Sequence, residues 1–316
     1  MSSPHIKATS PSFSKNPVLQ AEIARRPYRV TLNLEGRRLE GAALAEYLAD
    51  ADGAVIGLEQ MTEDVLKCCP KLRIIAKYGV GLDNLNHEAC RQNNIAIGWT
   101  AGVNRRSVSE MTLGFMLTLA HNVPVTNHLL KQGTWNKEGG IQLSGRTVGI
   151  IGLGNIGRDL VGLLRPFGCN ILGNDIVDMK EFAQKESVTL ATKEEIFKTA
   201  DFVTIHTPWT KETHHLINEH TLKLFHTDAF LINTSRGKIV DQTALKQALQ
   251  TRKLGGAALD VYEEEPPPDS EFLRLPSLIC TPHISGNSFE AVVAMGRSAI
   301  QHIDSFFKVV NPDNPP

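Results

Sequence analysis

The 316-residue chain is poor in cysteine and in aromatic residues, and it carries almost no net charge. Its five cysteines show no CxxC spacing, which argues against a disulfide framework or a zinc site and favours a reducing cytoplasm. Lysine and arginine number 33 against 34 aspartates and glutamates, so the chain lacks the basic field that attracts nucleic acid or an anionic membrane surface. We expect neither kind of partner.

Long hydrophobic runs and metal-ligand spacings are missing as well. The longest mostly apolar stretch, residues 111–120, is about half the length that a bilayer-spanning helix needs. The N-terminal residues lack a basic segment followed by an apolar core, so we expect a soluble protein that no signal peptide exports. The histidines include no HExxH pattern, and we therefore predict no metal.

What the chain does contain is an alternation of short β-rich runs and helical segments. The length predicts about two domains, and the alternation predicts parallel sheets joined by crossover helices. The first set of expected strands covers residues 6–9, 28–32, 54–58, 72–76 and 95–99, and the second covers 147–151, 170–173, 202–206, 229–233, 256–259 and 278–280. The expected fold class is α/β, with two doubly wound parallel-sheet domains.

Several segments outside these strands carry signals of their own. Residues 107–120 are apolar on more than one face, which predicts a buried helix linking the two sets of strands. Residues 288–309 carry apolar side chains at helical spacing and predict a long amphipathic helix. Thr192 and Glu195 match a capping box, Gly168 is placed to end a helix, and residues 10–14 are expected to form a polar loop.

The strongest local signal is a glycine motif, Gly152-Leu-Gly-Asn-Ile-Gly157, which directly follows the apolar run 147–151 and opens a helix. The first glycine would make a tight turn, the second would admit a pyrophosphate to the backbone, and the third would let the helix pack on the strand. Asp175 ends the next strand, where a carboxylate accepts hydrogen bonds from an adenosine ribose. Because a carboxylate there repels a 2′-phosphate, the predicted cofactor is NAD rather than NADP.

Polar segments follow three later strands, at residues 234–237, 260–266 and 281–283, and an open α/β sheet binds its ligands at the carboxyl ends of its strands. With these segments and the glycine motif, the chain resembles the D-isomer-specific 2-hydroxyacid dehydrogenase family, which includes phosphoglycerate, glycerate and D-lactate dehydrogenases. The resemblance is carried by residues 78–84, 145–158, 206–208, 233–241, 257–260 and 282–283. It implies a Rossmann NAD-binding domain (102–286) inserted into a flavodoxin-like substrate-binding domain (1–101 and 287–316).

The resemblance implies a catalytic trio. Arg236 would grip the substrate carboxylate and carbonyl oxygen, His283 would be the acid/base on the C2 oxygen, and Glu265 would be its partner. A guanidinium binds a carboxylate bidentately, and a carboxylate beside a histidine holds the ring for proton transfer. The structural alternatives are a helix-terminal ion pair for Arg236, a core position for His283 and a solvated acidic run for Glu265. Glu265 directly precedes Pro266, as in the family's Glu-Pro element, which selects it among three adjacent glutamates.

The resemblance also implies binding residues. Backbone N–H groups of the loop at Tyr78, Gly79, Val80 and Gly81 would bind the substrate carboxylate, with a plain strand-to-helix turn as the alternative. Asn104 matches a family asparagine and is either a nicotinamide contact or a helix cap. The expected cofactor contacts are Gly152, Gly154, Asn155, Ile156, Gly157, Asp175, Thr207, Pro208, Thr234, Ser235, Arg236, Asp260, His283 and Gly286.

The chain departs from the phosphoglycerate dehydrogenases in its first domain. Those enzymes carry a phosphate-binding arginine where this chain has Ile56, which weakens a 3-phosphoglycerate assignment, although Lys77 matches a basic residue that could meet a distal anion. The chain ends soon after the long helix, so we expect no serine-binding regulatory domain. We predict that Ser12 or Phe13 helps to sort substrates, an ordinary solvated loop being the alternative.

The predicted function is that of an NAD-dependent oxidoreductase that transfers a hydride between nicotinamide and a small D-2-hydroxy acid or 2-oxo acid. Family members are usually dimers joined through their NAD domains, and residues 124–140 with Trp135 resemble the arm that embraces a partner, so we expect a cytoplasmic homodimer. One alternative is a catalytically idle NAD(H)-sensing protein of the corepressor type. Another is a formate- or phosphite-type dehydrogenase, but formate enzymes use glutamine where this chain has Glu265.

Overall fold

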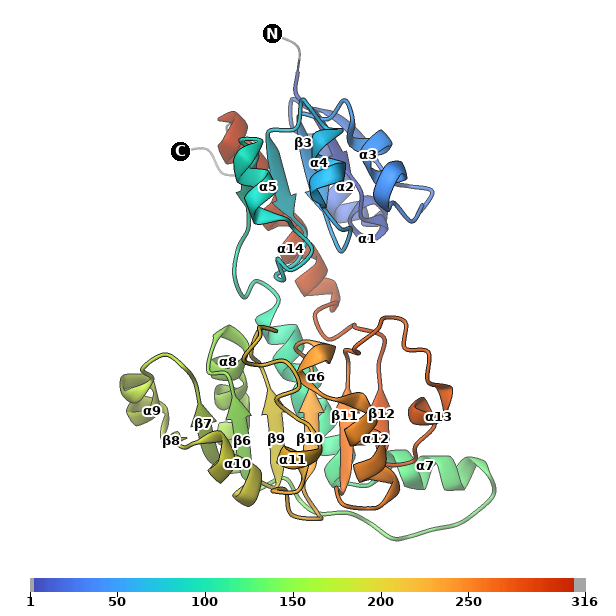
Figure 1. Ribbon diagram of the computed structural model, residues 1–316, viewed down its shortest axis with the longest axis vertical. Helices are drawn as coiled ribbons and strands as arrows, with labels where there is room; N and C mark the ends of the chain where they lie inside the picture. The colour runs from blue at the N-terminus through green and yellow to red at the C-terminus, as the bar shows by residue number, and fades with distance from the viewer. Residues whose placement is uncertain (1–2, 310–316) are drawn as a thin grey trace. The chain divides into compact units, whose positions relative to one another are not determined.

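The computed structural model describes residues 3–309, and within them the chain divides into two compact units (Figure 1). Unit 1 comprises residues 3–104 and 287–309, and unit 2 comprises residues 105–286. Unit 1 is therefore discontinuous in sequence, since the chain leaves it after Asn104 and returns to it after Gly286. The boundaries expected from the sequence lie after residues 101 and 286.

The sheet of unit 1 is built from parallel pairs in the order β2-β1-β3-β4-β5. Its strands are β1 (His5–Ala8), β2 (Arg29–Leu32), β3 (Gly53–Ile56), β4 (Ile74–Lys77) and β5 (Ala96–Gly98). This is the flavodoxin-like doubly wound order, which confirms the predicted fold class. The order reverses between β1 and β3, so the topological switch point of unit 1 lies at the carboxyl ends of these two strands.

Apolar cores cover both faces of this sheet, because successive side chains of a strand point to opposite faces. Val55 packs in the core that includes Ile300 of α14 (Phe289–Phe307), whereas its neighbours Ala54 and Ile56 pack in the opposite core. The first core also includes side chains of α1 (Pro11–Lys15) and α2 (Pro17–Ala24), and the second includes side chains of α3 (Gly41–Leu48), α4 (Glu63–Lys67) and α5 (His87–Gln92).

Unit 2 holds a second parallel sheet, in the order β12-β11-β10-β9-β6-β7-β8 (Figure 1). Read outward from β6, this is the Rossmann strand order with β12 added beyond it, as predicted. The switch point lies between β6 and β9. The strands are β6 (Thr147–Ile151), β7 (Asn170–Asn174), β8 (Thr189–Leu190), β9 (Phe202–Ile205), β10 (Phe230–Asn233), β11 (Gly256–Leu259) and β12 (Leu278–Cys280).

Helices cover both faces of the second sheet. Ile150 packs in a core with α6 (Arg105–Ala120), α8 (Asn155–Leu164) and α9 (Lys180–Glu186), whereas Ile151 packs on the other face. That other face is covered by α10 (Lys193–Thr199), α11 (Glu219–Leu222), α12 (Gln242–Gln250) and α13 (Ser270–Leu273). Helix α7 (Val123–Lys131) has no buried residue, and Trp135 beyond it is 77% exposed. The dimer arm expected at residues 124–140 stays a prediction.

Two local signals in the sequence set helix ends as predicted, and the structure adds a third. Thr192 and Glu195 form a capping box at the start of α10. Gly168 has φ +62° and ends the 3-10 turn Arg165–Phe167 that follows α8. Ser288 caps α14, with Oγ accepting a hydrogen bond from Ala291 N at 3.2 Å. The long amphipathic helix is therefore confirmed.

The predicted polar loop at residues 10–14 is wrong. Ser10 caps α1, and Pro11 occupies the first position of that helix, where a fixed φ and a missing N–H are both tolerated. Phe13 consequently turns inward and is fully buried in the apolar core. A role for Phe13 in sorting substrates is thereby excluded, while Ser12 lies exposed on the same helix.

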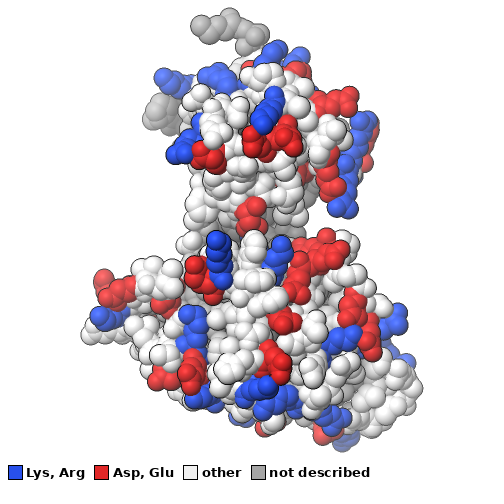
Figure 2. Space-filling view, viewed as in Figure 1, with Lys and Arg blue, Asp and Glu red and all other residues white. Residues whose placement is uncertain are grey.

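Charges of both signs are interspersed over the surface seen in Figure 2, with no extended field of one sign. Within residues 3–309, no helix is both long and apolar enough to cross a membrane. The same residues contain no group of three or more histidines, cysteines, aspartates or glutamates arranged to hold a metal ion. All five cysteines are free thiols.

Candidate active site

The glycine motif forms the turn between β6 and α8 in unit 2. Gly152 has φ +100°, and a Cβ there would lie only 2.7 Å from the carbonyl carbon of His206. A Cβ on Gly157 would lie 2.1 Å from Gly152 O, so only glycine lets the first turn of α8 come this close. Gly154 precedes α8, and a Cβ on it would meet no atom within 4 Å. The backbone is therefore open to a ligand at this position.

Asp175 follows β7 and fixes this turn. Its Oδ2 accepts a hydrogen bond from Leu153 N at 2.7 Å, and its Oδ1 accepts one from Val177 N at 3.0 Å. Each carboxylate oxygen has two lone pairs, so the group keeps acceptor capacity for a ribose hydroxyl. Ile176 and Val177 are 97% and 62% exposed and bring no positive charge to meet a 2′-phosphate. These contacts suit NAD better than NADP.

Two buried polar atoms beside the glycine turn have no partner among the described residues. They are Nδ1 of His206 and Oγ1 of Thr207, just after β9 at the switch point of unit 2. Nε2 of His206 lies 2.9 Å from Thr204 Oγ1, and burial lowers the pKa of His206 to about 3, so the ring is neutral. Buried polar atoms are rarely left unpaired. Their position beside an open glycine backbone fits the binding of NAD.

The other predicted cofactor residues of this region occupy varied environments. Asn155 and Ile156 form the first turn of α8, and Gly286 is the last residue of unit 2. Pro208 is exposed on the loop after β9. Asn104 has a buried Oδ1 with no partner in the part of the chain that the structure describes, so this oxygen does not cap α6.

Arg236 follows β10 and precedes the 3-10 turn Gly237–Ile239. Asn233, the buried last residue of β10, organises the segment: its Oδ1 accepts from Ser235 N at 3.0 Å, and its Nδ2 donates to Arg236 O at 2.9 Å. Arg236 Nη1 donates to Ser235 O at 2.7 Å. Thr234 is buried, with Oγ1 3.1 Å from Thr112 Oγ1. The strand end thus sets the backbone from which the half-buried guanidinium extends.

His283 and Glu265 are directly bonded. His283 Nδ1 lies 2.8 Å from Glu265 Oε2, and Glu265 Oε1 accepts from Tyr262 N at 3.1 Å. Burial alone would raise the pKa of Glu265. The hydrogen bond and charge of His283, the hydrogen bond from Tyr262 N and the charge of Arg236 outweigh burial, so the pKa of Glu265 is lowered. Glu263 instead bonds His215. Of the glutamate run, Glu265 is thus the carboxylate that meets His283.

The buried carboxylate of Asp260 shapes the turn that carries His283. Its Oδ1 accepts from Thr281 Oγ1 at 2.6 Å and from Ile284 N at 2.8 Å, and its Oδ2 accepts from Ser285 N at 2.8 Å. His283 has φ +55°, a left-handed conformation that costs free energy for a residue with a side chain. The three hydrogen bonds therefore hold a strained turn in place.

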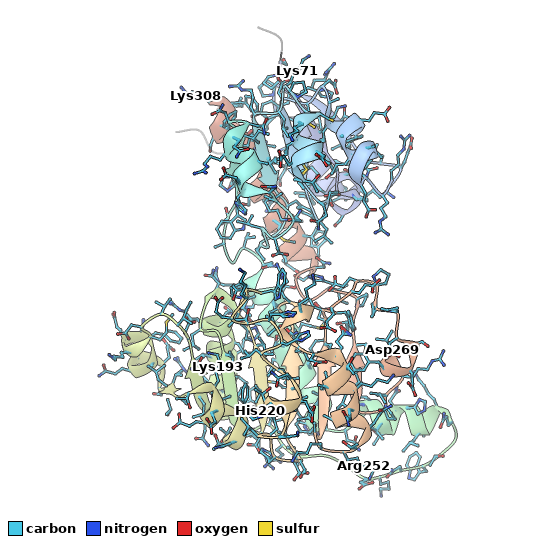
Figure 3. The ribbon with its side chains drawn as sticks, in the orientation of Figure 1. Lys71, Lys193, His220, Arg252, Asp269 and Lys308 are labelled. Carbon is cyan, nitrogen blue, oxygen red and sulfur yellow. The ribbon has the colours of Figure 1, made fainter. Side chains whose placement is uncertain are left out.

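Replacing Asp260 by asparagine is expected to lower the free energy of unfolding by about 2 kcal/mol, because the amide nitrogen cannot accept a backbone N–H. Denaturant unfolding measures this loss. Asp269→Asn is the matched control: Asp269, labelled in Figure 3, caps α13, and asparagine caps as well as aspartate. Equal stability of the two variants would contradict the role given to Asp260.

In unit 1, the predicted substrate loop follows β4. Gly79 has φ +142°, a conformation that favours glycine, and residues 79–81 are partly exposed. Tyr78 before them is buried. Trp99, just after β5, donates a hydrogen bond from Nε1 to Val80 O at 2.9 Å. The loop is thereby fixed from the neighbouring strand, with its backbone accessible.

The expectation that Lys77 meets a distal anion is wrong. The side chain is 3% exposed and donates to Gly57 O and, at 2.7 Å, to Asn84 Oδ1. Asn84 in turn donates from Nδ2 to Glu59 O at 2.7 Å. Lys77 therefore ties together the loops after β3 and β4 from inside the unit. Ile56, at the arginine position of the phosphoglycerate enzymes, is fully buried in the apolar core.

Sequence reasoning missed the residues that hold the site residues in place. Trp99 fixes Val80, Asn233 fixes the backbone before Arg236, and the backbone N–H of Tyr262 binds Glu265. One signal was available in the sequence: a polar residue that ends an apolar strand, as Asn233 ends β10, has few uses other than bonding the segment that follows it.

Comparison with known proteins reveals the relatives of this chain. Residues 113–285 match the model of the D-isomer specific 2-hydroxyacid dehydrogenase family, NAD binding domain. The chain is 38% identical over 283 residues to a D-3-phosphoglycerate dehydrogenase of Methanocaldococcus jannaschii, a match over 86% of this chain and 54% of that protein. It is 33% identical over 279 residues to a glyoxylate reductase of Korarchaeum cryptofilum, over 86% and 84% of the two chains.

A solved structure agrees with these matches. A D-lactate dehydrogenase of Aquifex aeolicus, complexed with NAD and lactic acid, has a TM-score of 0.84 and 25% identity over 96% of this chain and 95% of that one. The chain spans about half the length of the phosphoglycerate dehydrogenase that it matches, but most of the glyoxylate reductase. The matched domain is an NAD-binding domain, in agreement with the glycine turn and Asp175. The chain belongs to the D-isomer-specific 2-hydroxyacid dehydrogenase family.

Proposed function

We propose that this protein is an NAD-dependent oxidoreductase that interconverts a small D-2-hydroxy acid and its 2-oxo acid. The observation that carries the proposal is the 2.8 Å contact between His283 Nδ1 and Glu265 Oε2, with the charge of Arg236 acting on the same carboxylate. All three residues follow strands of unit 2 at their carboxyl ends, where an open α/β sheet binds ligands. A histidine held by a carboxylate near a guanidinium suits proton transfer on an acid substrate.

In the reductive direction, His283 donates a proton to the C2 oxygen, and in the oxidative direction it takes that proton back. Nδ1 is engaged with Glu265, so the transfer belongs to Nε2. The lowered pKa keeps Glu265 ionised, and its charge stabilises the protonated ring. When bound, NAD supplies or accepts the hydride at C2. Positioned acid/base catalysis of this kind contributes about 10²–10⁴-fold in rate.

The remaining predicted residues bind and orient. Arg236 neutralises the substrate carboxylate and polarises the adjacent carbonyl, since a guanidinium presents a planar fork of donors. In unit 1, the backbone N–H groups of residues 79–81 offer donors for a substrate carboxylate. Gly154, with the neighbouring Thr207, binds the phosphates of NAD, and Asp175 binds its ribose.

A panel of 2-oxo acids with NADH tests the proposal. We expect the purified protein to oxidise NADH in the presence of at least one of glyoxylate, pyruvate, hydroxypyruvate and phosphohydroxypyruvate. Absorbance of NADH follows the reaction, and fluorescence titration measures NADH binding separately. Tight NADH binding without turnover of any 2-oxo acid would contradict the enzyme proposal and favour an NAD(H)-sensing protein.

The preference for NADH over NADPH is expected to depend on Asp175. Asp175→Asn removes the charge that repels a 2′-phosphate and keeps an oxygen for Leu153 N, so the ratio of kcat/KM for the two cofactors should narrow about tenfold. Asp178→Asn is the matched control, because Asp178 is an exposed carboxylate on the same loop. A cofactor ratio that changes equally in both variants would refute the specific role of Asp175.

A further inference from the structure

The hydroxyl groups of Ser12 and Tyr78 meet at the switch point of unit 1. Ser12 Oγ and Tyr78 Oη lie 2.9 Å apart. Ser12 is on α1, which follows β1, and Tyr78 follows β4, the strand next to β3. The crevice outside the carboxyl ends of the strands at a switch point is where doubly wound sheets bind ligands. Neither hydroxyl has a part in the proton transfer or cofactor binding proposed above.

The pair is held rigidly from the core side. The ring of Tyr78, 8% exposed, packs edge-on against Phe13 at a centroid distance of 5.6 Å and an interplanar angle of 80°. Burial raises the pKa of Tyr78 against the opposing effect of its hydrogen bond with Ser12, so the phenol keeps its proton at neutral pH. Ser12 is exposed. The core thus fixes one hydroxyl, and the surface presents the other.

Tyr78 links the hydroxyl pair in sequence to the loop that the proposed function gives to the substrate carboxylate. Tyr78 is the residue directly before Gly79, and consecutive Cα atoms lie about 3.8 Å apart. The loop is fixed by Trp99 at Val80 O. A Cβ on Gly79 would lie 3.3 Å from Lys77 Cε, so the loop also packs on the buried lysine. The loop backbone and the hydroxyl pair are therefore each held in place by the contacts of unit 1.

Charges of both signs lie where β1 and β3 end, since Glu59 bonds Gly57 N and the Lys77 ammonium bonds Gly57 O. Glu59 Oε2 accepts from Gly57 N at 2.8 Å, and a Cβ on Gly57 would lie 3.4 Å from that carboxylate and 3.1 Å from Ser10 Cβ, so a negative charge lies where β1 and β3 end. Lys77 is buried and bonded within the unit. The arginines of the loop after β2 are ion-paired, Arg37 with Glu35 and Arg38 with Glu40.

We propose that Ser12 and Tyr78 bind the side group of the 2-oxo acid and select one with an uncharged hydroxyl on C3, a 3-hydroxy-2-oxo acid. The inference rests on the proposed function, since it needs the substrate carboxylate on residues 79–81. One hydroxyl of the pair donates to the other, which leaves one proton to donate and lone pairs to accept, as a ligand hydroxyl requires. A methyl group offers neither interaction, and a phosphate ester no longer carries the hydroxyl proton on C3.

The test compares kcat/KM for hydroxypyruvate, pyruvate and phosphohydroxypyruvate with NADH. Hydroxypyruvate and pyruvate differ by one hydroxyl, and the wild type is expected to favour hydroxypyruvate by about tenfold or more. Ser12→Ala and Tyr78→Phe are each expected to reduce that ratio by about five- to tenfold. The double variant should lose little more, because both hydroxyls belong to one hydrogen-bonded pair.

Ser305→Ala is the matched control, because it removes an exposed serine hydroxyl from α14 in the same unit and should keep the wild-type ratio. Circular dichroism and thermal denaturation establish whether Tyr78→Phe is folded. Because Ser12 is exposed, Ser12→Ala tests the same pair without disturbing the core. Two results would overturn the inference and leave the proposed function standing. One is an unchanged ratio of kcat/KM for hydroxypyruvate over pyruvate in both Ser12→Ala and Tyr78→Phe. The other is a preference of the wild-type protein for phosphohydroxypyruvate. Absence of turnover with every 2-oxo acid would overturn both.

Discussion

Replacing His283 by alanine is expected to lower kcat by about 10²–10⁴-fold, because the C2 oxygen then loses the group that donates and accepts its proton. NADH affinity should be largely retained, since the bond between His283 and Glu265 belongs to the acid/base pair and leaves the glycine turn untouched. Steady-state kinetics with the best 2-oxo acid of the panel and fluorescence titration with NADH measure the two quantities. The KM for the acid is expected to change much less than kcat.

His220→Ala is the control for this variant. His220 is an exposed histidine on α11, labelled in Figure 3, and its replacement should leave kcat at the wild-type value. Glu265→Gln extends the test: it keeps the size of the side chain and removes the charge that holds the protonated ring, so kcat should fall, by less than in His283→Ala. A His283→Ala variant with normal kcat would remove this histidine from its proposed role.

Replacing Arg236 by lysine is expected to lower kcat/KM for the 2-oxo acid by about 10²-fold, although the positive charge is kept. A lysine ammonium is a point charge and cannot present the planar fork that engages a carboxylate and polarises the neighbouring carbonyl. Loss of the contact with the substrate carboxylate should raise KM, and loss of the contact with the carbonyl oxygen should lower kcat. The charge near Glu265 is preserved, so the lowered pKa of that carboxyl should persist.

Arg252→Lys provides the matched control, because Arg252 is exposed in the turn after α12 and is labelled in Figure 3. Thermal denaturation separates a folding defect of Arg236→Lys from a binding defect, since Arg236 Nη1 also donates to Ser235 O. If Arg236→Lys kept wild-type kcat/KM, the carboxylate would have to be bound by other groups.

Both sheets were predictable because a strand that is covered on both faces reads as a continuous apolar run, as in residues 148–151. The glycine turn was predictable because Gly152 and Gly157 stand where any side chain would collide with backbone. Strand β8 was not, because its two residues, Thr189 and Leu190, are exposed and carry no apolar signal. Periodicity thus predicts buried strands and overlooks short edge strands.

The site was harder to predict than the fold, because inward or outward orientation of a side chain depends on tertiary packing. Lys77 ends a strand buried on both faces, so its ammonium bonds inside the unit. Phe13 belongs to a helix of a single turn, too short to show periodicity, and packs into the core. The roles given to Arg236 and His283 came from family resemblance, since no residue pattern relates positions so far apart in the chain.

The discontinuity of unit 1 has a consequence for synthesis on the ribosome. Residues 3–104 leave the ribosome with one face of their sheet lacking α14, whose Ile300 joins the core around Val55. At about 5–20 residues per second, translation of residues 105–286 takes roughly 10–40 s before that helix emerges. Throughout this interval that sheet face is covered by α1 and α2 but not by α14, while unit 2 is completed. We therefore expect unit 2 to complete its fold before unit 1 does.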